Sequence, residues 1–206
     1  MNSKGIWKGL KKTDKKALRT RMITARARLS EKFVERASAI ICSKLASTPQ
    51  FKKAESILFY YPIGNEVDCR PAMENAFAEG KRVFLPRIRG WKFDIVEVKS
   101  FHSLDGMKKG ELGVREPKGN STPLEKIDLI VVPGVAFDGN GHRIGYGGGY
   151  YDVLLKKRKN KRPAAIGLCY SKLLLVRKIP CEAHDKQVDY IVSETKVIGC
   201  SKKGRK

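Results

Sequence analysis

The chain has no apolar run long enough to cross a membrane, because its longest runs, such as residues 127–132, fall far short of the ~20 residues that a spanning helix needs. It also has no Cys-x-x-Cys pair. Its five cysteines are scattered and odd in number, which favours reduced thiols over disulfides or a zinc site. The first twelve residues lack the apolar segment of a secretory signal. These absences predict a cytoplasmic protein that contacts no membrane.

Familiar nucleotide and nucleic-acid motifs are missing as well. The sequence contains neither the P-loop pattern G-x-x-x-x-G-K-[ST] nor the dinucleotide pattern G-x-G-x-x-G. Its basic clusters lack interleaved aromatics, and no RRM, KH, zinc-finger or helix-turn-helix pattern occurs. A nucleic-acid-binding module is therefore the weaker of two functional hypotheses, although the net charge is +22.

That charge is concentrated in three places. Residues 1–28 carry +9, residues 156–162 carry +6 and residues 201–206 carry +4, which leaves only +3 for the rest of the chain. Basic termini could attract nucleic acid in a salt-dependent way, or they could simply be solvated and aid solubility. Residues 1–12 are predicted to form a disordered basic lead, residues 13–198 a single domain and residues 199–206 a basic tail.

Two amphipathic helices are predicted at the start of the domain. A stripe of Leu18, Met22, Ala25 and Leu29 indicates a helix from about residue 13, with Arg and Lys on its other faces. Ser30 is expected to cap a second helix, which Thr48-Pro49 ends. The buried face of this second helix is expected to consist of Phe33, Ala37, Ile40, Ile41 and Leu45.

Strands and helices then alternate. Strands are predicted at residues 56–61, 81–85, 93–98, 127–132, 164–169 and 189–192, with helices at residues 70–79 and 149–158. The polar segment 99–123 is expected to be a long loop or a cover over the substrate. The alternation predicts an α/β fold with a mostly parallel sheet covered on both faces, and ligands bind such sheets beyond the carboxyl ends of their strands.

The most informative stretch is PGVAFDGNGHRIGYGGGYYD, residues 133–152. Four of the five residues from 145 to 149 are glycine, and such a cluster indicates a backbone with φ > 0 or one that lies close to a ligand. A glycine-rich turn that opens a helix gathers free N–H groups at the positive end of the helix dipole, which suits phosphate. A flexible surface loop is the alternative, but Arg143 and Asp152 on its two sides argue against it.

This stretch resembles the signature of the 5-formyltetrahydrofolate cyclo-ligases, also called methenyltetrahydrofolate synthetases, over about twenty consecutive positions. Other segments are similar to motifs of that family. They are residues 15–19 (K-x-x-L-R), residues 64–68 (G-x-E-V-D), residues 113–117 (G-[IV]-x-E-P, assigned only to loop shaping) and residues 179–189 (I-P-x-E-x-H-D-x-x-V-D). The resemblance implies a three-layer α/β/α fold of the kind shared with ribose-5-phosphate isomerase and CoA transferases.

The resemblance also implies an activity. A family member converts 5-formyltetrahydrofolate to 5,10-methenyltetrahydrofolate with ATP and Mg²⁺, releasing ADP and phosphate. A formamide oxygen is a poor leaving group, so the γ-phosphoryl group is transferred to it before N10 of the folate attacks. The protein then needs only to position the reactants and stabilise phosphoryl charge. A monomer that binds reduced folate and ATP is expected, and an ATP-using paralogue for another small amide stays an alternative.

Site residues follow from the matched motifs. The expected catalytic residues are Arg143 and Tyr150, and the expected magnesium ligands are Asp152 and Asp185. The expected nucleotide-binding residues are Lys15, Lys16, Ala17, Leu18, Arg19, Arg143, Ile144, Gly145, Tyr146, Gly147, Gly148, Gly149, Tyr150 and Tyr151. The expected folate-binding residues are Ile63, Glu66, Asp68, Tyr146, Gly147, Gly148, Gly149 and Tyr150.

Two of these assignments have alternatives. Lys15 and Arg19 are four residues apart and could grip one anion from one helix face, but their spacing also describes two exposed cations on a basic helix. Asp68 could accept N–H donors of the pterin, or it could cap the helix that follows it. The loop also departs from the G-R-G-K-G form of some relatives, so that phosphate neutralisation would depend more on Arg143 and magnesium.

Overall fold

The computed structural model describes residues 14–175 and 178–200, so the predicted lead and residues 201–206 of the predicted tail lie outside the described residues. Within them, seven strands form the main sheet in the order β12-β11-β9-β6-β1-β2-β3. The five inner strands are parallel, and the edge strands β3 and β12 are antiparallel to their neighbours. The bounds are β1 Ser56–Leu58, β2 Arg82–Arg89, β3 Lys92–Val98, β6 Leu129–Val132, β9 Ala164–Leu168, β11 Tyr190–Val192 and β12 Val197–Gly199.

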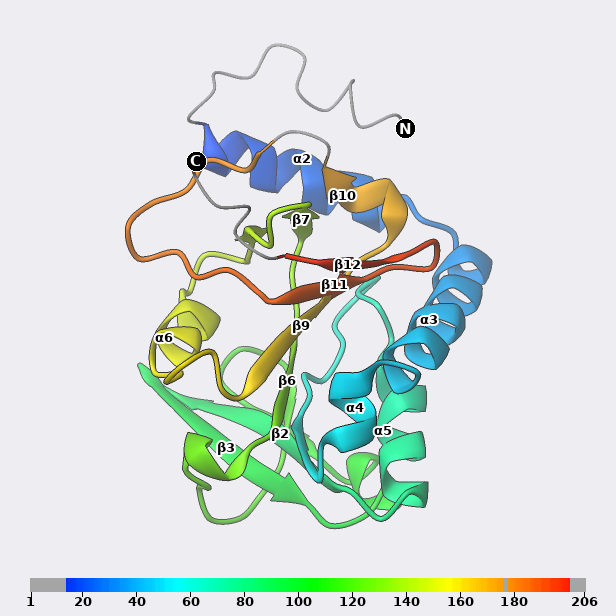
Figure 1. Cartoon of the computed structure of the whole chain (residues 1–206), viewed down its shortest axis with the longest axis vertical. Coiled ribbons are helices and arrows are strands. Elements are labelled where there is room, and N and C mark those ends of the chain that lie inside the picture. Colours follow the sequence, from blue (N-terminus) through cyan, green and yellow to red (C-terminus); the bar gives the residue numbers. More distant parts are fainter. Residues whose placement is uncertain (1–13, 176–177, 201–206) are drawn as a thin grey trace.

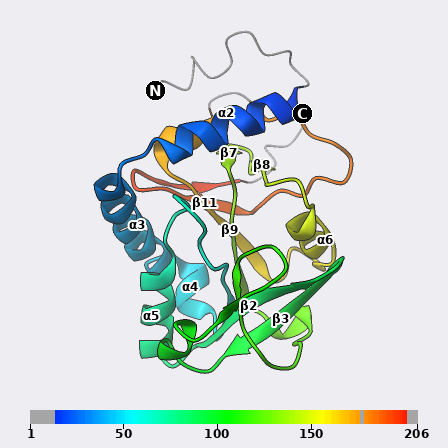
Figure 2. The same cartoon turned by 180° about the vertical axis from the view of Figure 1, so that it is seen from behind.

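Helices cover both faces of this sheet (Figures 1 and 2). On one side lie α3 (Glu31–Ala46), α4 (Pro49–Lys53) and α5 (Arg70–Ala78), and on the other lies α6 (Tyr150–Lys156). The helix α2 (Lys15–Ala27) crosses one end of the molecule. All four residues of β6 are buried, as a strand covered on both faces requires. The predicted three-layer α/β/α fold with a mostly parallel sheet is confirmed.

Several short elements were not predicted, because two or three residues are too few to show a period. A second sheet has the order β10-β7-β8, and a hairpin pairs β4 with β5. Their bounds are β4 Lys108–Lys109, β5 Arg115–Glu116, β7 Ala136–Asp138, β8 Arg143–Ile144 and β10 Leu174–Leu175. Three 3₁₀ turns are η1 His102–Leu104, η2 Leu124–Lys126 and η3 Ser171–Leu173.

The helix α3 ends at Ala46, just before Thr48-Pro49 as predicted, and the side chain of Thr48 then caps α4 by accepting a hydrogen bond from the Phe51 amide. Two other local predictions need correction. The second strand, predicted at residues 81–85, runs on through Pro86 to Arg89. Its pairing with β1 stops at Phe84, so beyond that point β2 has only β3 beside it among the described strands, and a proline is tolerated there. Ile40 is not part of the buried face of α3, since it is 37% exposed.

The buried face of α2 contains one side chain that was not predicted. Asp14 caps this helix by accepting a hydrogen bond from the Ala17 amide at 2.8 Å, and Leu18 and Met22 enter the core as predicted. The third buried position, four residues after Met22, is Arg26, which is 6% exposed. The prediction that Arg and Lys occupy only the other faces is therefore wrong for Arg26.

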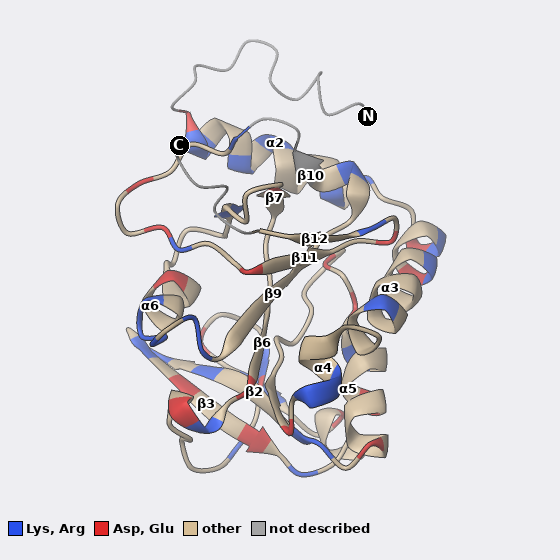
Figure 3. Ribbon diagram, in the orientation of Figure 1, with Lys and Arg blue, Asp and Glu red and all other residues tan. Residues whose placement is uncertain are grey.

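The basic residues of the described chain and its cysteines are placed as follows. Lys and Arg lie along α2 and on the segment after α6 (Figure 3), where Arg158 pairs with Asp189. All five cysteines are free, and four of them are buried. Among the described helices, none combines the length and the apolar character that crossing a membrane requires.

Candidate active site

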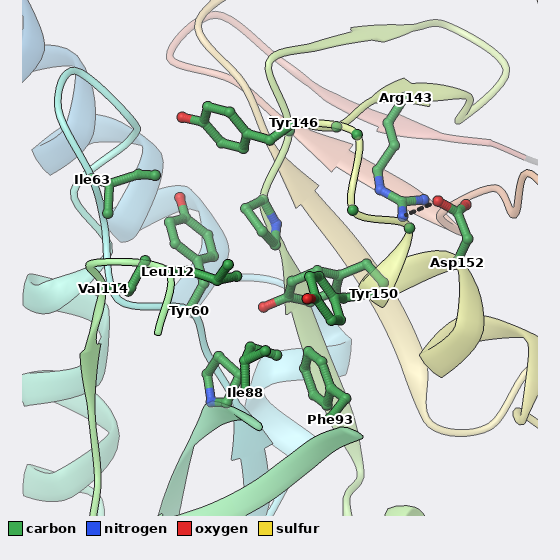
Figure 4. Close-up of a pocket in the computed structure, with 18 of the residues that line it drawn as sticks. Tyr60, Ile63, Ile88, Phe93, Leu112, Val114, Arg143, Tyr146, Tyr150 and Asp152 are labelled. Atoms are coloured by element: carbon green, nitrogen blue, oxygen red, sulfur yellow. Dashed lines mark ion pairs between the residues drawn. The ribbon is translucent and has the colours of Figure 1, made fainter. Parts of the chain in front are cut away.

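A cavity of about 480 Å³ opens beside the carboxyl ends of β1 and β6, which is where open α/β sheets bind ligands. Its volume is within the ordinary range for small-molecule sites. The lining comes from α2, from the segments that follow β1 and β6, from β2 and β3, and from residues 145–149, called the glycine loop from here on. Segments distant in sequence therefore meet around one space (Figure 4).

The glycine loop needs its glycines for two different reasons. Gly147 and Gly149 have φ values of +114° and +68°, in the region that side chains disfavour. Gly148 lacks a positive φ, but a methyl group there would lie 2.6 Å from Cε2 of Tyr150. A methyl group on Gly145 would meet nothing within 4 Å. The expected close or left-handed backbone is thus present, and three of the four glycines are required by it.

Two cations from α2 hold the walls of the cavity. Lys15 Nζ lies 2.6 Å from Asp185, and Arg19 Nε donates to the Gly145 carbonyl at 2.7 Å. Both residues line the cavity, as their spacing on one helix face allows. Burial acts to raise the pKa of Asp185, but hydrogen bonds from Lys15 and the Glu182 amide lower it overall. Asp185 is therefore a carboxylate at neutral pH.

The side chain of Arg143 points toward Asp152, away from the ring of Tyr146 (Figure 4). Its guanidinium pairs with Asp152 at 3.1 Å and donates to the Lys186 carbonyl at 2.9 Å, while the Lys186 amide donates to Asp152. Burial lowers the pKa of Arg143, and Asp152 opposes that shift. Because an arginine starts so far above neutrality, the side chain stays charged. A buried, oriented cation of this kind is suited to phosphate.

The carboxylates of Asp152 and Asp185 are hard oxygen donors of the type that magnesium prefers. Each already faces a cation, Arg143 or Lys15, and no group of three or more His, Cys, Asp or Glu gathers among the described residues. They do not form a complete protein cage. They do fit a magnesium ion held by one or two carboxylates together with substrate phosphates and water.

The other end of the cavity is mainly apolar and aromatic, and the buried carboxylate of Glu66 belongs to it. Glu66 is 5% exposed and accepts a hydrogen bond from the Ile63 amide at 3.1 Å. Burial raises the pKa of Glu66, against the attraction of the neighbouring Arg26. The surrounding side chains are Tyr60, Tyr61, Ile88 and Phe93. Such a surface suits a flat ring system that presents N–H donors.

Most of the predicted site residues line this cavity. Those that do are Lys15, Arg19, Ile63, Glu66, Arg143, Gly145, Tyr146, Gly147, Gly148, Gly149, Tyr150, Tyr151, Asp152 and Asp185. Those that do not are Lys16, Ala17, Leu18, Ile144 and Asp68. Leu18 and Ile144 belong to the core, and Lys16 is exposed. Only two of the five positions in the first motif therefore reach the cavity.

Asp68 is held by Arg70. Both carboxylate oxygens accept hydrogen bonds from the Arg70 guanidinium, and one also accepts from the Arg70 amide at 3.0 Å. This arrangement anchors the start of α5. Asp68 therefore makes its contacts at the start of α5, where Cys69 is the N-cap, and it does not line the cavity, so its role in folate binding stays a prediction.

Several lining residues were missed. Leu112, Val114 and Glu116 come from the segment 99–123, which agrees with a cover over the substrate. The motif at residues 113–117 is the sequence signal for this part of the lining, although the resemblance alone assigns it only to loop shaping. Tyr150 also reaches the turn between β2 and β3, where its hydroxyl donates a hydrogen bond to the Gly90 carbonyl at 3.2 Å.

A three-layer α/β fold with a cavity at the carboxyl ends of its strands, cationic at one end and aromatic at the other, is the arrangement of an α/β protein that binds small molecules. Comparison with known proteins gives the family. A profile of the 5-formyltetrahydrofolate cyclo-ligase family matches residues 11–194. The chain belongs to that family.

Individual relatives agree. The chain is 30% identical over 199 residues to a probable 5-formyltetrahydrofolate cyclo-ligase of Schizosaccharomyces pombe, covering 89% of this chain and 97% of the relative. It is 28% identical over 158 residues to the 5-formyltetrahydrofolate cyclo-ligase of Escherichia coli K12, covering 75% and 86%. The solved structure of Aquifex aeolicus 5,10-methenyltetrahydrofolate synthetase is similar with a TM-score of 0.80 and 36% identity, covering 94% and 95%.

Proposed function

We propose that the protein catalyses the ATP-dependent cyclisation of 5-formyltetrahydrofolate to 5,10-methenyltetrahydrofolate, with release of ADP and phosphate. The observation that carries this proposal is a single cavity with two chemically different ends. Glu66 and its aromatic neighbours suit the reduced pterin, and the glycine loop with Arg143 suits phosphate. The names of the relatives support the same reaction.

The reaction proceeds in two steps. The γ-phosphoryl group moves from ATP to the formyl oxygen of the folate, and the bond between the γ-phosphorus and the ADP oxygen breaks. N10 then attacks the activated formyl carbon, and the carbon–oxygen bond breaks as phosphate leaves with the former formyl oxygen. The N10 proton is lost to the departing phosphate or to water. The protein acts by holding the reactants in line and by stabilising phosphoryl charge.

Residue roles follow from the geometry. Arg143 is oriented by Asp152 and the Lys186 carbonyl, and it faces the phosphates together with the amides of the glycine loop. Lys15 adds a second positive charge at the same end, while Arg19 holds the loop backbone. Bound magnesium would neutralise phosphate charge, and Asp152 and Asp185 are the carboxylates that would hold it.

Tyr150 completes the proposed catalytic pair with Arg143. It lies between the glycine loop and the turn after β2, where its ring packs against Gly148 and its hydroxyl against Gly90. A monomeric, cytoplasmic protein that uses reduced folate and ATP is part of the same proposal. Five free thiols support the cytoplasmic location.

The order of bond changes is tested with 5-formyltetrahydrofolate whose formyl oxygen carries an isotopic label. If phosphorylation precedes ring closure, the label appears in the released phosphate, one labelled oxygen for each ADP formed. Label found in water, or ring closure without ADP formation, would exclude the phosphorylated intermediate.

A further inference from the structure

Arg26 is a buried cation that the reaction described above does not use. It lies four residues after Met22 and eight after Leu18, so it shares the core-facing side of α2. The residue is only 6% exposed. Burying a guanidinium is costly unless its charge and its hydrogen-bond donors are satisfied. Its partners therefore indicate what it does.

Those partners come from three walls of the cavity. Nη1 of Arg26 lies 3.5 Å from Oε1 of Glu66 and 3.4 Å from the Gly134 carbonyl at the end of β6. Nη2 contacts the Tyr146 hydroxyl, and the guanidinium lies 5.3 Å from the centre of the Tyr146 ring. In Figure 4 Tyr146 points away from Arg143 and toward Ile63. One side chain thus connects the carboxylate end of the cavity with the glycine loop.

We infer that Arg26 is a positioning residue that pairs with Glu66, the proposed acceptor for the reduced pterin, and holds the glycine loop in place through Tyr146. The folate end and the phosphate end of the cavity are then assembled by the same guanidinium. This inference rests on the proposed function, because it assigns the folate to Glu66.

The electrostatics around Glu66 support this role. Burial raises the pKa of Glu66, and the charge of Arg26 is the strongest influence that lowers it, followed by the Ile63 amide and Tyr146. Among the described residues, other titratable groups that interact with this carboxylate include Tyr60, Cys69, Tyr146, Tyr151 and Tyr170. Burial raises the pKa of each of these groups, so they are neutral near pH 7.

Removal of the Arg26 charge should therefore shift the pKa of Glu66 in a defined direction. The pKa of Glu66 rises further, and the carboxylate becomes protonated at a higher pH than in the native protein. A protonated acid is a poorer acceptor for a pair of N–H donors. Affinity for the folate should then fall as the pH is lowered, and in the variant this fall should begin at a higher pH, closer to neutrality, than in the native protein.

The test follows the titration of Glu66 in the full chain without ligand, by NMR of protein carrying ¹³C-labelled glutamate, with Glu66→Gln to identify the resonance. Arg26→Gln removes the charge and keeps hydrogen-bond donors. Arg28→Met is the control, because Arg28 is an exposed cation at the end of the same helix. We expect the Glu66 midpoint to rise by at least about one pH unit in Arg26→Gln and to stay unchanged in Arg28→Met.

A second variant, Arg26→Lys, separates charge from shape. The ammonium keeps the positive charge, so the Glu66 midpoint should stay within about half a pH unit of the native value. A lysine cannot reproduce the planar contact with Tyr146, so ATP affinity measured by calorimetry should fall. If Arg26→Gln does not fold, this variant decides alone, and an Arg26→Lys protein with native affinity for ATP would overturn the inference.

The two proposals fail in different ways. A native protein without cyclo-ligase turnover would refute the proposed function, while the titration of Glu66 would still report on Arg26. An active enzyme in which Arg26→Gln leaves the Glu66 midpoint and the pH dependence of folate binding unchanged would refute the positioning role alone. A loss of stability without either change would assign Arg26 to the core.

Discussion

Replacing Gly148 with alanine tests the close packing inside the glycine loop. The added methyl group would lie 2.6 Å from Cε2 and 2.9 Å from Cδ2 of Tyr150, whereas carbon atoms in good contact are about 3.5–4.0 Å apart. The ring must therefore shift by roughly 1 Å, which disturbs the hydrogen bond from its hydroxyl to the Gly90 carbonyl. Overpacking of this kind costs about 1–3 kcal/mol.

The assay is thermal unfolding without ligand, followed by ATP-dependent turnover. Gly145→Ala is the matched control for stability, since a methyl group there meets nothing within 4 Å. We expect Gly148→Ala to lower stability by about 1–3 kcal/mol and Gly145→Ala to change it by less than about 0.5 kcal/mol. In a Tyr150→Ala background the Gly148 substitution should cost little, because the clashing ring is gone. An equal cost in both backgrounds, or none in either, would refute this reasoning.

Three further predictions concern single side chains. Asp68→Ala should lower stability by about 0.5–2 kcal/mol, as loss of a helix-end acceptor does, and should leave the KM for folate unchanged; a selective loss of folate affinity would return Asp68 to the substrate. Asp152→Asn keeps the side-chain volume and should leave the fold unchanged by circular dichroism. It should lower turnover at least about tenfold, because Arg143 loses its orienting charge. Native turnover with native magnesium dependence would remove Asp152 from the site. Tyr151→Phe should not lower the melting temperature, because its buried hydroxyl has no hydrogen-bond partner among the described residues; a marked loss of stability would show that the hydroxyl is paired.

The features that could be predicted from the sequence are those that depend on local pattern. Leu18 and Met22 gave α2 its core stripe, Ser30 gave α3 its cap, and the glycines at 147 and 149 indicated left-handed backbone. The parallel sheet followed from strands alternating with helices. Each of these inferences needs only residues close together in the chain, where geometry limits the alternatives.

The rest depends on which side chains pair in the folded chain. The motif assigns Asp68 to the folate, but its carboxylate pairs with Arg70, two residues further along, at the start of α5. Arg26 could have been suspected from its four-residue spacing after Met22, yet its partners Glu66 and Tyr146 are 40 and 120 residues away. Charge on a buried helix face is recognised only when the opposing wall of the cavity is known.

The measurement that tests the central claim most directly is the near-ultraviolet absorbance of the methenyl product. Purified protein is mixed with 5-formyltetrahydrofolate and magnesium, with ATP present or omitted, and with Arg143→Met as the inactive comparison. The account predicts that absorbance rises only when ATP is present, with one ADP formed per product, and that Arg143→Met loses most of this rate. Product formation without ATP, or no product from a folded native protein under any of these conditions, would contradict it.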